Sequence, residues 1–253
     1  MLAVNRQAQM VRLLSDLGSL KTGEIAERLA VTHETIRKDF ELLENRGQLV
    51  RTHGGATLPD RQKQEIPLAV RQSIRYAEKR SIAQAAAARI QPNEIIFLDA
   101  SSTVHALTEF IPRMPLTILT NSPHIFTALA ERTDLDLICT GGLYDPKSSS
   151  FIGLPAEQAL QRYHIHRMFF SGNGIDLKRG VSEINSRQAA FKERVAENAD
   201  DVVFLADHSK FGVKSSFFFV NAAALSCVVT NKLPEPVTVE FFFKNQIELV
   251  VPD

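Results

Sequence analysis

Short polar segments follow five apolar runs in the C-terminal part of the sequence. The runs are EIIFL, LTILT, LDLICT, HRMFF and DVVFLA, and hydroxyl, amide, glycine or charged residues come after each. Hydroxyls and glycine-flanked backbone amides suit an anion, and a lysine adds a point charge. The residues concerned are Asp99, Ser101, Ser102, Thr103, Asn121, Gly141, Gly142, Gly172, Gly174 and Lys210. One such segment alone is more typical of a simple turn, but five together favour a binding site.

These segments meet only if the strands before them are parallel. Seven short apolar stretches read as strands, and helical stretches separate most of them: residues 94–99, 116–121, 135–140, 166–172, 201–207, 225–230 and 247–251. Such alternation predicts a mainly parallel sheet with helices on its faces. The carboxyl ends of parallel strands share one edge, where open α/β sheets bind ligands. We therefore expect residues 77–253 to form an α/β domain with a ligand site at that edge.

A second group of reactive side chains lies in VTHETIRKDFELLENRG, residues 31–47. On a helical wheel of about 100° per residue, the exposed N-terminal half presents His33, Arg37 and Lys38. These side chains suit the half of a recognition helix that reaches base edges and phosphates. An ordinary solvated helix face is the alternative. The charge of residues 1–58, 8 Lys and Arg against 7 Asp and Glu, does not decide between them.

The elements that would position this helix occupy residues 1–58. We expect three short helices followed by a hairpin, because QLVRTHGGATL has two β-type arms around Gly54 and Gly55. The expected caps are Asn5, Thr22 and Thr32 at the helix N-termini, and Gly18 and Gly47 after the first and third helices. Residues 59–76 are polar, are interrupted by prolines and read as a linker.

Asp39 falls inside the apolar arc of the third helix, which we assign to Ile36, Phe40, Leu42 and Leu43. A buried carboxylate costs several kcal/mol unless it is paired. We therefore interpret Asp39 as structural, bonded to a basic side chain or to helix-end amides, and not as a DNA contact.

Bulk composition narrows the class of protein. The 253 residues are 44% hydrophobic and 23% charged, as is ordinary for a globular protein, and the formal net charge is zero, so any nucleic-acid contact must be local. Cys139 and Cys227 lie in apolar β-type runs and are expected to be buried, reduced thiols. The Phe clusters at 217–219 and 241–243 are expected in the core or at a subunit contact.

The sequence does not favour a metalloprotein, a cofactor-dependent protein, a secreted protein or a membrane protein. Neither a metal nor a cofactor is expected, since no metal-ligand spacing occurs in the sequence. The N-terminus lacks an apolar signal core, and no apolar run approaches the roughly 20 residues that span a bilayer. We therefore expect a cytoplasmic protein without a membrane partner.

The segment VTHETIRKDF, residues 31–40, with HGGA at 53–56, resembles the winged helix-turn-helix of the DeoR family of bacterial sugar-metabolism repressors. The usual pattern is Val-Ser-x-x-Thr-Ile-Arg-Arg-Asp-Leu, then Arg-x-His-Gly-Gly-Ala. Thr32, Lys38 and Phe40 replace the usual Ser, Arg and Leu, and Lys38 keeps the charge without the bidentate fork of arginine. The resemblance implies DNA contacts from Thr32, His33, Thr35, Arg37, Lys38, Arg51 and His53, the last two from the wing.

The resemblance extends to the C-terminus. FLDASST is similar to the family's Asp-x-Gly-Thr-Thr loop, and DHSKFG matches its Asp-His-Ser-Lys-Phe-Gly. Lys192 falls at the family's lysine, Ser101 replaces a Gly, and Gln188 replaces an acidic residue. The resemblance implies a sensor domain similar to the ribose-5-phosphate isomerase and glucosamine-6-phosphate deaminase folds. Such a domain binds a phosphorylated sugar or related metabolite, which releases the repressor from double-stranded operator DNA.

Two alternatives were weighed against this interpretation. A sugar-phosphate isomerase needs a base near a carbon-bound proton, for which Glu183, Asp207 and His208 are candidates. No acid-base constellation extends beyond them, so we expect a non-catalytic sensor. A winged helix that contacts only protein is disfavoured by Arg37, Lys38 and the wing. Operator palindromes favour a homo-oligomer, a dimer or a tetramer.

Overall fold

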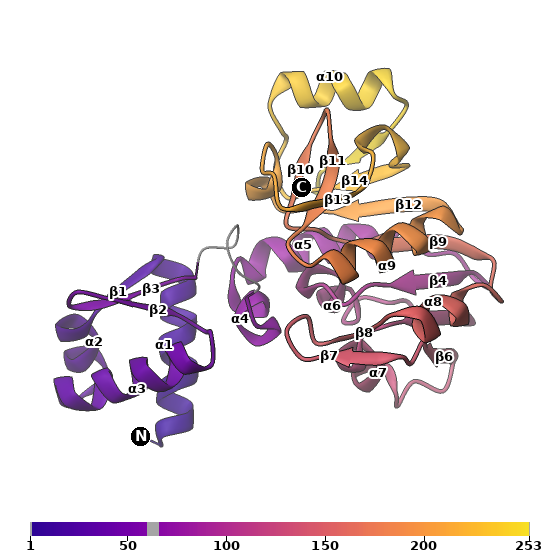
Figure 1. Cartoon of the computed structure of the whole chain (residues 1–253). Helices are drawn as coiled ribbons and strands as arrows, with labels where there is room; N and C mark the ends of the chain where they lie inside the picture. Colours follow the sequence, from indigo (N-terminus) through magenta and orange to yellow (C-terminus); the bar gives the residue numbers. More distant parts are fainter. Residues whose placement is uncertain (1, 60–65, 253) are drawn as a thin grey trace. The chain divides into compact units, whose positions relative to one another are not determined.

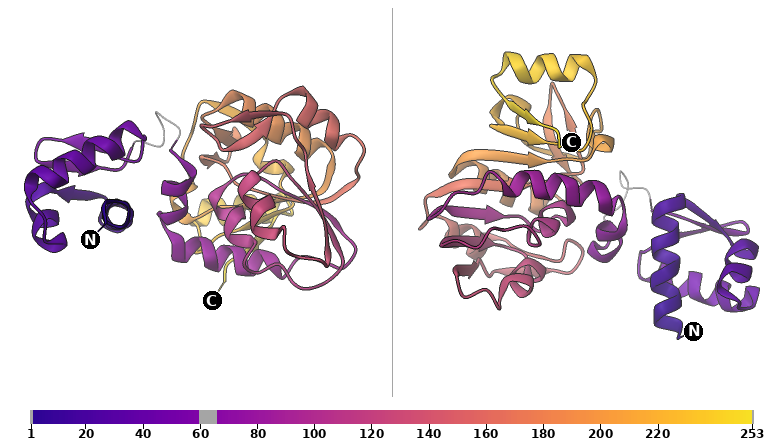
Figure 2. Two further views of the ribbon diagram at one scale, coloured as in Figure 1. Left: turned by 90° about the horizontal axis from the view of Figure 1, so that it is seen from below. Right: turned by 180° about the vertical axis from the view of Figure 1, so that it is seen from behind.

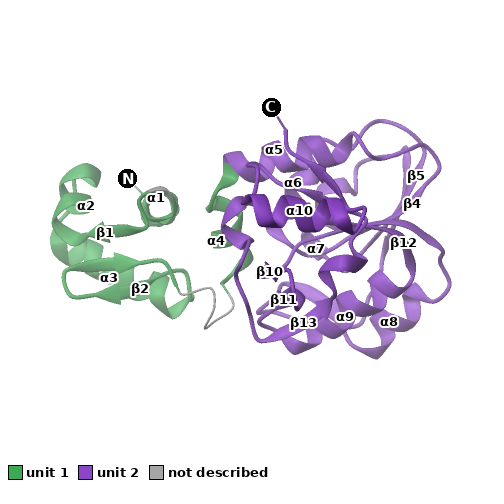
Figure 3. Ribbon diagram, turned by 90° about the horizontal axis from the view of Figure 1, so that it is seen from above, with its two compact units in different colours: residues 1–76 green, residues 77–253 purple. Residues whose placement is uncertain are grey.

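The computed structural model describes residues 2–59 and 66–252. The chain forms two compact units, residues 1–76 and residues 77–253 (Figure 3).

Residues 2–59 of the first unit combine three helices with a small antiparallel sheet (Figure 1). The helices are α1 (Ala3–Leu17), α2 (Thr22–Leu29) and α3 (His33–Asn45), and the strands are β1 (Ser19–Lys21), β2 (Val50–Thr52) and β3 (Gly55–Thr57) in the order β1-β3-β2. The three helices and the β2–β3 hairpin confirm the expectation. Strand β1 was not expected, because three residues carry too little periodicity to mark a strand.

The ends of α3 confirm the local sequence signals. Thr32 precedes the helix, and its side chain accepts a hydrogen bond from the Thr35 amide. Gly47 has φ +67°, and its amide donates to the Glu44 carbonyl at 2.8 Å, while the Gln48 amide donates to the Leu43 carbonyl at 2.9 Å. These two bonds form the Schellman motif, in which glycine accepts the left-handed conformation after the last turn.

Two expected N-caps are wrong. Helix α1 begins at Ala3 rather than after Asn5, because the Arg6 amide already donates to the Leu2 carbonyl at 3.1 Å. Thr22 is the first residue of α2 and not its cap. Its amide donates to the Gly54 carbonyl at 2.8 Å in the hairpin turn, so β1 runs directly into the helix. Both differences arise from backbone bonds that a cap-residue pattern does not report.

The core of the first unit is formed by α1, α2, α3 and the sheet. The buried stripe of α3 consists of Ile36, Asp39, Phe40 and Leu43, at helical spacing. Leu42 was expected inside this arc but is 46% exposed, because it lies to one side of that stripe.

The segment that reads as a linker contains a helix. Residues 60–65 lie outside the described part of the chain, and α4 (Leu68–Ser73) follows them. Ile66, Val70 and Ile74 are buried in the same hydrophobic cluster as Met10 and Leu14 of α1. Apolar residues on both sides of Pro67 thus add to the first unit's core.

The second unit is built on a seven-stranded parallel sheet. Its strands are β4 (Ile95–Leu98), β5 (Leu116–Thr120), β6 (Leu135–Cys139), β9 (Ile165–Phe170), β12 (Ala199–Leu205), β14 (Cys227–Val229) and β15 (Glu248–Val250), in the order β15-β14-β12-β9-β4-β5-β6. Every neighbouring pair is parallel. These are the seven strands that the apolar stretches predict, so the parallel α/β domain is confirmed.

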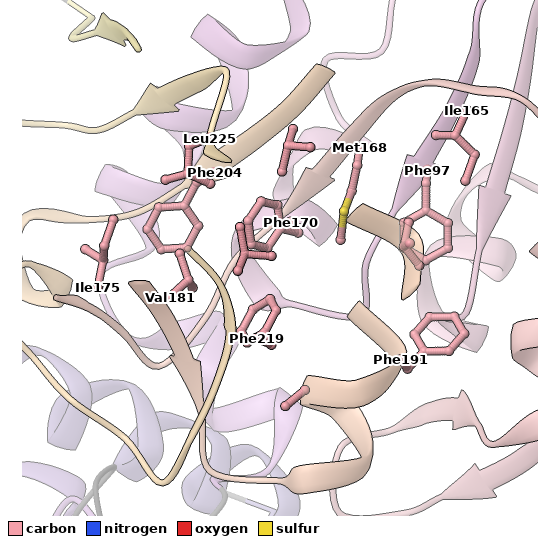
Figure 4. Close-up of a cluster of buried hydrophobic side chains, with 14 of the residues drawn as sticks. Phe97, Ile165, Met168, Phe170, Ile175, Val181, Phe191, Phe204, Phe219 and Leu225 are labelled. Carbon is pink, nitrogen blue, oxygen red and sulfur yellow. The ribbon is translucent and has the colours of Figure 1, made fainter. Parts of the chain in front are cut away.

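Helices cover both faces of this sheet (Figure 2). They are α5 (Tyr76–Ala87), α6 (Ser102–Leu107), α7 (Pro123–Leu129), α8 (Leu154–Leu160), α9 (Ser186–Glu197) and α10 (Pro236–Lys244), with single 3-10 turns at His208–Lys210 (η1) and Ala222–Ala224 (η2). Alternate residues of one strand enter opposite cores: Phe169 packs with residues of α5, α6 and α7, whereas Met168 and Phe170 pack with residues of α8 and α9. Figure 4 shows Met168 and Phe170 with Phe191 and Phe219 in the second of these cores. Burial on both faces explains why the strands are almost continuously apolar.

Two small antiparallel sheets were not expected from the sequence. One is the hairpin of β7 (Leu143–Asp145) and β8 (Ser150–Ile152), and the other joins β10 (Gly174–Asp176), β11 (Gly180–Glu183) and β13 (Phe217–Val220). These strands have only three or four residues, and all except β13 contain polar or glycine positions, so they carry a weaker signal than the strands of the main sheet.

The Phe clusters and the cysteines divide between core and surface. Phe219 and Phe242 are buried, whereas Phe217 and Phe243 are exposed. Cys227 is buried as expected, but Cys139 is half-buried, and both are free thiols. Cys139 lies in β6, which is at the edge of the sheet and is therefore less covered. No helix in the described part of the chain is long and apolar enough to cross a membrane.

Candidate functional site

Helix α3 exposes a polar face along its first two turns. The Thr32 hydroxyl caps the helix and lies 2.9 Å from the Thr35 hydroxyl. His33, Arg37 and Lys38 are all exposed, on the side opposite the buried stripe. Thr35 is half-buried between these two faces. The structure therefore brings the expected helical contacts onto one accessible surface.

The two basic side chains on this face differ in their surroundings. The Lys38 ammonium lies 3.8 Å from the Glu34 carboxylate, and both side chains are largely exposed, so this pair contributes little energy. No acidic side chain among residues 2–59 and 66–252 forms an ion pair with Arg37. The Arg37 guanidinium can therefore offer its donors to a nucleic acid without first breaking a salt bridge.

The wing is fixed to the C-terminal half of α3. The Arg51 amide donates to a Glu44 carboxylate oxygen at 2.8 Å, and Arg51 Nε lies 3.9 Å from the other oxygen. His53 is exposed in the turn beside Gly54, whose φ of +86° requires glycine-like freedom. Arg51 and His53 thus lie on a hairpin that is attached to the candidate recognition helix.

Asp39 has the structural role expected of it. Its side chain is buried, with one oxygen 2.6 Å from Arg6 Nε and the other 2.7 Å from Gln7 Nε2. The hydrogen bond that Arg6 donates to Asp39, together with the negative charge of Asp39, raises the pKa of Arg6 against the opposing effect of burial. Arg46 in turn donates to the side-chain oxygen Oε1 of Gln7 at 3.2 Å. This network joins α1 to the buried side of α3, away from the exposed basic face.

In the second unit, polar groups meet at the carboxyl ends of β4 and β9. Asp99 is buried; its Oδ1 accepts from the Ser101 amide at 3.0 Å, and its Oδ2 accepts from the Ser171 amide at 3.3 Å. Lys210 donates to the Ser171 hydroxyl at 2.7 Å and to the Gly172 carbonyl at 2.5 Å. Ser171 therefore links two of the predicted site residues, Asp99 and Lys210, across neighbouring strands.

Lys192 of α9 was absent from the predicted set of site residues, although it lies at the centre of this arrangement. Its ammonium is 2.8 Å from Asp99 Oδ2, 2.8 Å from the Ser171 carbonyl and 2.5 Å from Glu183 Oε1. Burial lowers the pKa of Lys192, but the charges and hydrogen bonds of Asp99 and Glu183 outweigh burial and raise it. The sequence carries a signal of this burial, because Lys192 lies three residues from both Ala189 and Val195. That spacing places the lysine on the apolar face of α9.

The Ser101–Thr103 segment joins β4 to α6. The Ser101 hydroxyl caps this helix by accepting from the Val104 amide at 3.2 Å. Ser102 and Thr103 are buried, and the Thr103 hydroxyl has no hydrogen-bond partner among the described residues. A buried hydroxyl without a partner costs about 1–3 kcal/mol, so this atom is suited to a ligand contact.

Asn121 and the predicted glycines have clear structural surroundings. Asn121 Nδ2 donates to the Phe151 carbonyl at 3.1 Å, while its Oδ1 is buried with no partner among the described residues. A Cβ atom on Gly142 would lie 2.8 Å from the Ile152 carbonyl oxygen. One on Gly172 would lie 2.6 Å from Val181 Cγ1, and one on Gly174 would lie 2.4 Å from the Val213 carbonyl oxygen. Close packing therefore requires glycine at these three positions, whether or not a ligand approaches them.

Gly141 differs from the other three predicted glycines. A Cβ atom there would meet nothing within 4 Å, and its φ is +63°. The conformation of the turn after β6 is the reason for glycine at this position.

The three candidate catalytic residues are engaged elsewhere. Glu183 is bound to Lys192, and Asp207 caps η1 by accepting from the Ser209 amide at 3.1 Å and its hydroxyl at 2.5 Å. His208 is exposed, and its amide donates to Asn231 Oδ1 at 2.9 Å. The geometry does not place a general base and a general acid around one reacting position.

A helix-turn-helix with a wing, followed by a parallel α/β domain with polar strand ends, defines a two-domain DNA-binding regulator that carries a sensor. Residues 6–62 match the DeoR-like helix-turn-helix domain, and residues 74–232 match the DeoR C terminal sensor domain. The chain belongs to the DeoR family of transcriptional regulators and is not an enzyme.

Relatives match almost the whole chain. The HTH-type transcriptional regulator YulB of Bacillus subtilis is 34% identical over 249 residues, which cover 98% of this chain and 96% of that protein. A putative aga operon transcriptional repressor of Escherichia coli O157:H7 is 30% identical and covers 97% and 93%. An L-fucose operon activator of Haemophilus influenzae is 32% identical and covers 91% and 93%. The relatives therefore include both a repressor and an activator.

Solved structures resemble the fold at low sequence identity. Ribose 5-phosphate isomerase A of Methanocaldococcus jannaschii is 14% identical, with a TM-score of 0.40 over 53% of each chain. The sorbitol operon regulator SorC of Klebsiella pneumoniae is 10% identical, with a TM-score of 0.41 over 92% of this chain and 99% of that one. Neither likeness bears on function.

Proposed function

We propose that this regulator represses a carbohydrate-catabolism operon and is released from its operator by a phosphorylated sugar or a related metabolite. The proposal rests on two features that occur in one chain. Helix α3 has an exposed basic face, and a group of polar side chains suited to bind an anion surrounds Ser171 at the edge of the parallel sheet. The relatives named for sugar operons support the class of regulated gene. Because bacterial operators lie in the cytoplasm, the cytoplasmic location belongs to the same proposal.

The proposed DNA contacts divide by position. Thr32, His33 and Thr35 lie at the start of α3, where hydroxyls and imidazole can reach phosphates or base edges. Arg37 is the candidate for direct base readout, since its guanidinium can form a bidentate pair with guanine. Lys38 supplies a positive charge near the phosphates. Arg51 and His53 would contact the backbone or minor groove from the wing.

The proposed effector contacts surround the ends of β4, β9 and β12. Lys210 supplies a charge for the phosphate, and the Thr103 hydroxyl lacks a protein partner. Asp99 holds Ser101 and Ser171 in place, so it orders the loops beside the ligand. The remaining positions in the proposed set are Ser102, Asn121, Gly141, Gly142, Gly172 and Gly174.

A symmetric oligomer is part of the proposal, because operators read by helix-turn-helix proteins are commonly palindromic. We infer a homodimer or a tetramer, in which two recognition helices meet half-sites one helical turn apart. Light scattering of the purified protein with and without operator DNA would measure the state directly.

The decisive experiment measures DNA release by sugar phosphates. Fluorescence anisotropy would follow binding to the DNA upstream of the regulator's own and neighbouring genes, in the presence of a panel of sugar phosphates. The Lys210→Ala variant should bind DNA normally but require roughly 10- to 150-fold more effector, because a charge-assisted bond is worth about 1.5–3 kcal/mol. Lys178→Ala, an exposed lysine of the same unit, is the matched control.

Two results would count against this proposal. If Lys210→Ala releases DNA at the same effector concentration as the Lys178→Ala control, Lys210 is not the phosphate contact. If no sugar phosphate changes the affinity of the unaltered protein for DNA, the effector belongs to another chemical class. Because a ligand shifts an equilibrium only by its differential affinity for two states, a coupling of about 1–3 kcal/mol is expected.

A further inference from the structure

The hairpin of β7 and β8 forms a separate two-stranded sheet (Figure 1), and it contacts Asn121 of the proposed effector site. Its register pairs Leu143 with Ile152, Tyr144 with Phe151 and Asp145 with Ser150. The hairpin starts directly after Gly141 and Gly142, which follow β6. A two-stranded hairpin is marginally stable by itself. Its position therefore depends on the side chains that attach it to the rest of the unit.

Asn121 makes the first attachment, at the end of β5. The Phe151 amide donates to the Asn121 carbonyl at 2.8 Å, and Asn121 Nδ2 donates to the Phe151 carbonyl at 3.1 Å. These bonds orient the Asn121 amide group, because its NH₂ end must face the carbonyl. Its Oδ1, buried and without a partner among the described residues, is the end left for a ligand hydroxyl. Hairpin and proposed effector site thus share one residue.

A chain of side-chain hydrogen bonds makes the second attachment, to α9. Ser148 Oγ lies 2.7 Å from Asp145 Oδ2 and 2.9 Å from Ser150 Oγ. Gln188 Nε2 donates to Ser150 Oγ. Asn185, the N-cap of α9, donates to the same Asp145 oxygen at 2.9 Å.

The direction of every bond in this chain is fixed by its carboxylate end. A carboxylate only accepts, so the one hydrogen of Ser148 points to Asp145. Ser148 must then accept from Ser150, and Ser150 must accept from Gln188. Burial raises the pKa of Asp145, but bonds from Ser148, Lys147 and Asn185 outweigh burial and lower it, which keeps that end ionised.

Only a hydrogen-bond donor at position 188 completes this chain of side-chain hydrogen bonds. Ser148, Ser150 and Gln188 are 3%, 0% and 4% exposed, so water has little access to replace a missing partner. An ionised glutamate at position 188 would present a second acceptor to the single Ser150 hydrogen. The chain would break at one of its bonds, and a buried acceptor would lose its donor.

We propose that Gln188 is a positioning residue for the effector response, because the chain through Ser150, Ser148 and Asp145 holds the β7–β8 hairpin against Asn121 at the effector site. This inference rests on the proposed function for its ligand. The arrangement of the hairpin can be tested without any ligand. Gln188 itself donates to the hairpin and is not assigned a ligand contact.

The first test measures hydrogen exchange of the hairpin in the full-length protein. Gln188→Glu reverses the polarity of the first bond, and Ser150→Ala removes the middle of the chain with a smaller change in volume. Both should increase exchange of hairpin amides such as that of Phe151 by about tenfold, which corresponds to about 1.4 kcal/mol. Arg187→Ala, an exposed neighbour on α9, is the matched control. Exchange at the control level in both variants would overturn the hydrogen-bond chain.

The second test uses operator DNA with glucose 6-phosphate, ribose 5-phosphate and inorganic phosphate as probes. Gln188→Glu and Ser150→Ala should need about tenfold more of the active probe for release, with unchanged DNA affinity in its absence. A merely structural role would loosen the hairpin while leaving the active concentration unchanged, and that result overturns the positioning role. If no probe acts on the unaltered protein, the positioning role falls with the proposed function, while exchange alone still decides the hydrogen-bond chain.

Discussion

Replacing Asp39 by alanine should destabilise the DNA-binding unit without removing a DNA contact. Asp39 is 2% exposed and accepts hydrogen bonds from Arg6 and Gln7. Removing one partner of a buried ion pair typically costs about 3–5 kcal/mol. The lower end applies here, because the Arg6 side chain keeps 11% exposure and water can reach part of it.

A loss of about 3 kcal/mol is large for a unit of this size. The unit spans residues 1–76, so its total stability is on the order of 4–11 kcal/mol at about 0.05–0.15 kcal/mol per residue. The melting temperature of this unit should fall by about 12–24 °C, since 1 kcal/mol corresponds to roughly 4–8 °C for such a domain. Even at the lower limit, the remaining stability of about 1 kcal/mol keeps most molecules folded at 25 °C.

Calorimetry of the full-length protein measures this effect, with hydrogen exchange of α3 peptides assigning the transition to the first unit. Glu41→Ala is the matched control, because it removes an exposed carboxylate from the same helix. Operator binding at low temperature should stay close to that of the control. If Asp39→Ala melts like Glu41→Ala while operator binding is lost, Asp39 contacts DNA and the buried-pair interpretation is wrong.

Three further predictions follow from the described contacts. Arg37→Ala should weaken operator binding by about 1–3 kcal/mol in a titration at fixed salt, and the loss should exceed that of Lys38→Ala. If the two variants bind the operator with equal affinity, Arg37 does not read a base. Lys192→Met removes the cation that pairs with the buried Asp99 and the half-buried Glu183, so the sensor unit should lose about 3–5 kcal/mol in urea unfolding, and an unchanged midpoint contradicts this. Burial raises the pKa of Cys227 to about 12, so at pH 8 only about one molecule in 10⁴ carries the thiolate. Iodoacetamide should therefore label the half-buried Cys139 first in the folded protein, as checked by digestion and mass spectrometry, and earlier labelling of Cys227 would contradict this.

Local chemistry determined much of the fold directly from the sequence. Thr32 and Gly47 mark the ends of α3 because a hydroxyl satisfies a helix-end amide and glycine accepts positive φ. The seven apolar stretches predict the parallel sheet, because strands buried on both faces must be apolar almost throughout. Leu42 shows where this reasoning fails, since apolarity alone does not say which side of a helix the core lies on.

The tertiary structure decided what the site residues do. Asp99 and Ser171 are 72 residues apart, and Lys210 and Ser171 are 39 apart, so no local pattern reports that they meet. Gly142 reads in the sequence as a position of close ligand approach, and only the structure shows that the Ile152 backbone also requires glycine there. Lys192 carried a visible signal, a lysine on an apolar helix face, yet its three acceptors come from three different segments.

The same distinction applies to the hairpin. Each of Asp145, Ser148, Ser150 and Gln188 is an unremarkable polar residue in the sequence. Folding brings them into contact, and the one-way donation from amide to carboxylate exists only in that arrangement. Side-chain type, set by the sequence, determines which groups can donate and accept. Long-range packing alone determines which of these groups become partners. Hydrogen bonds act over about 3 Å, and residues far apart in the sequence come within that distance only when the chain folds.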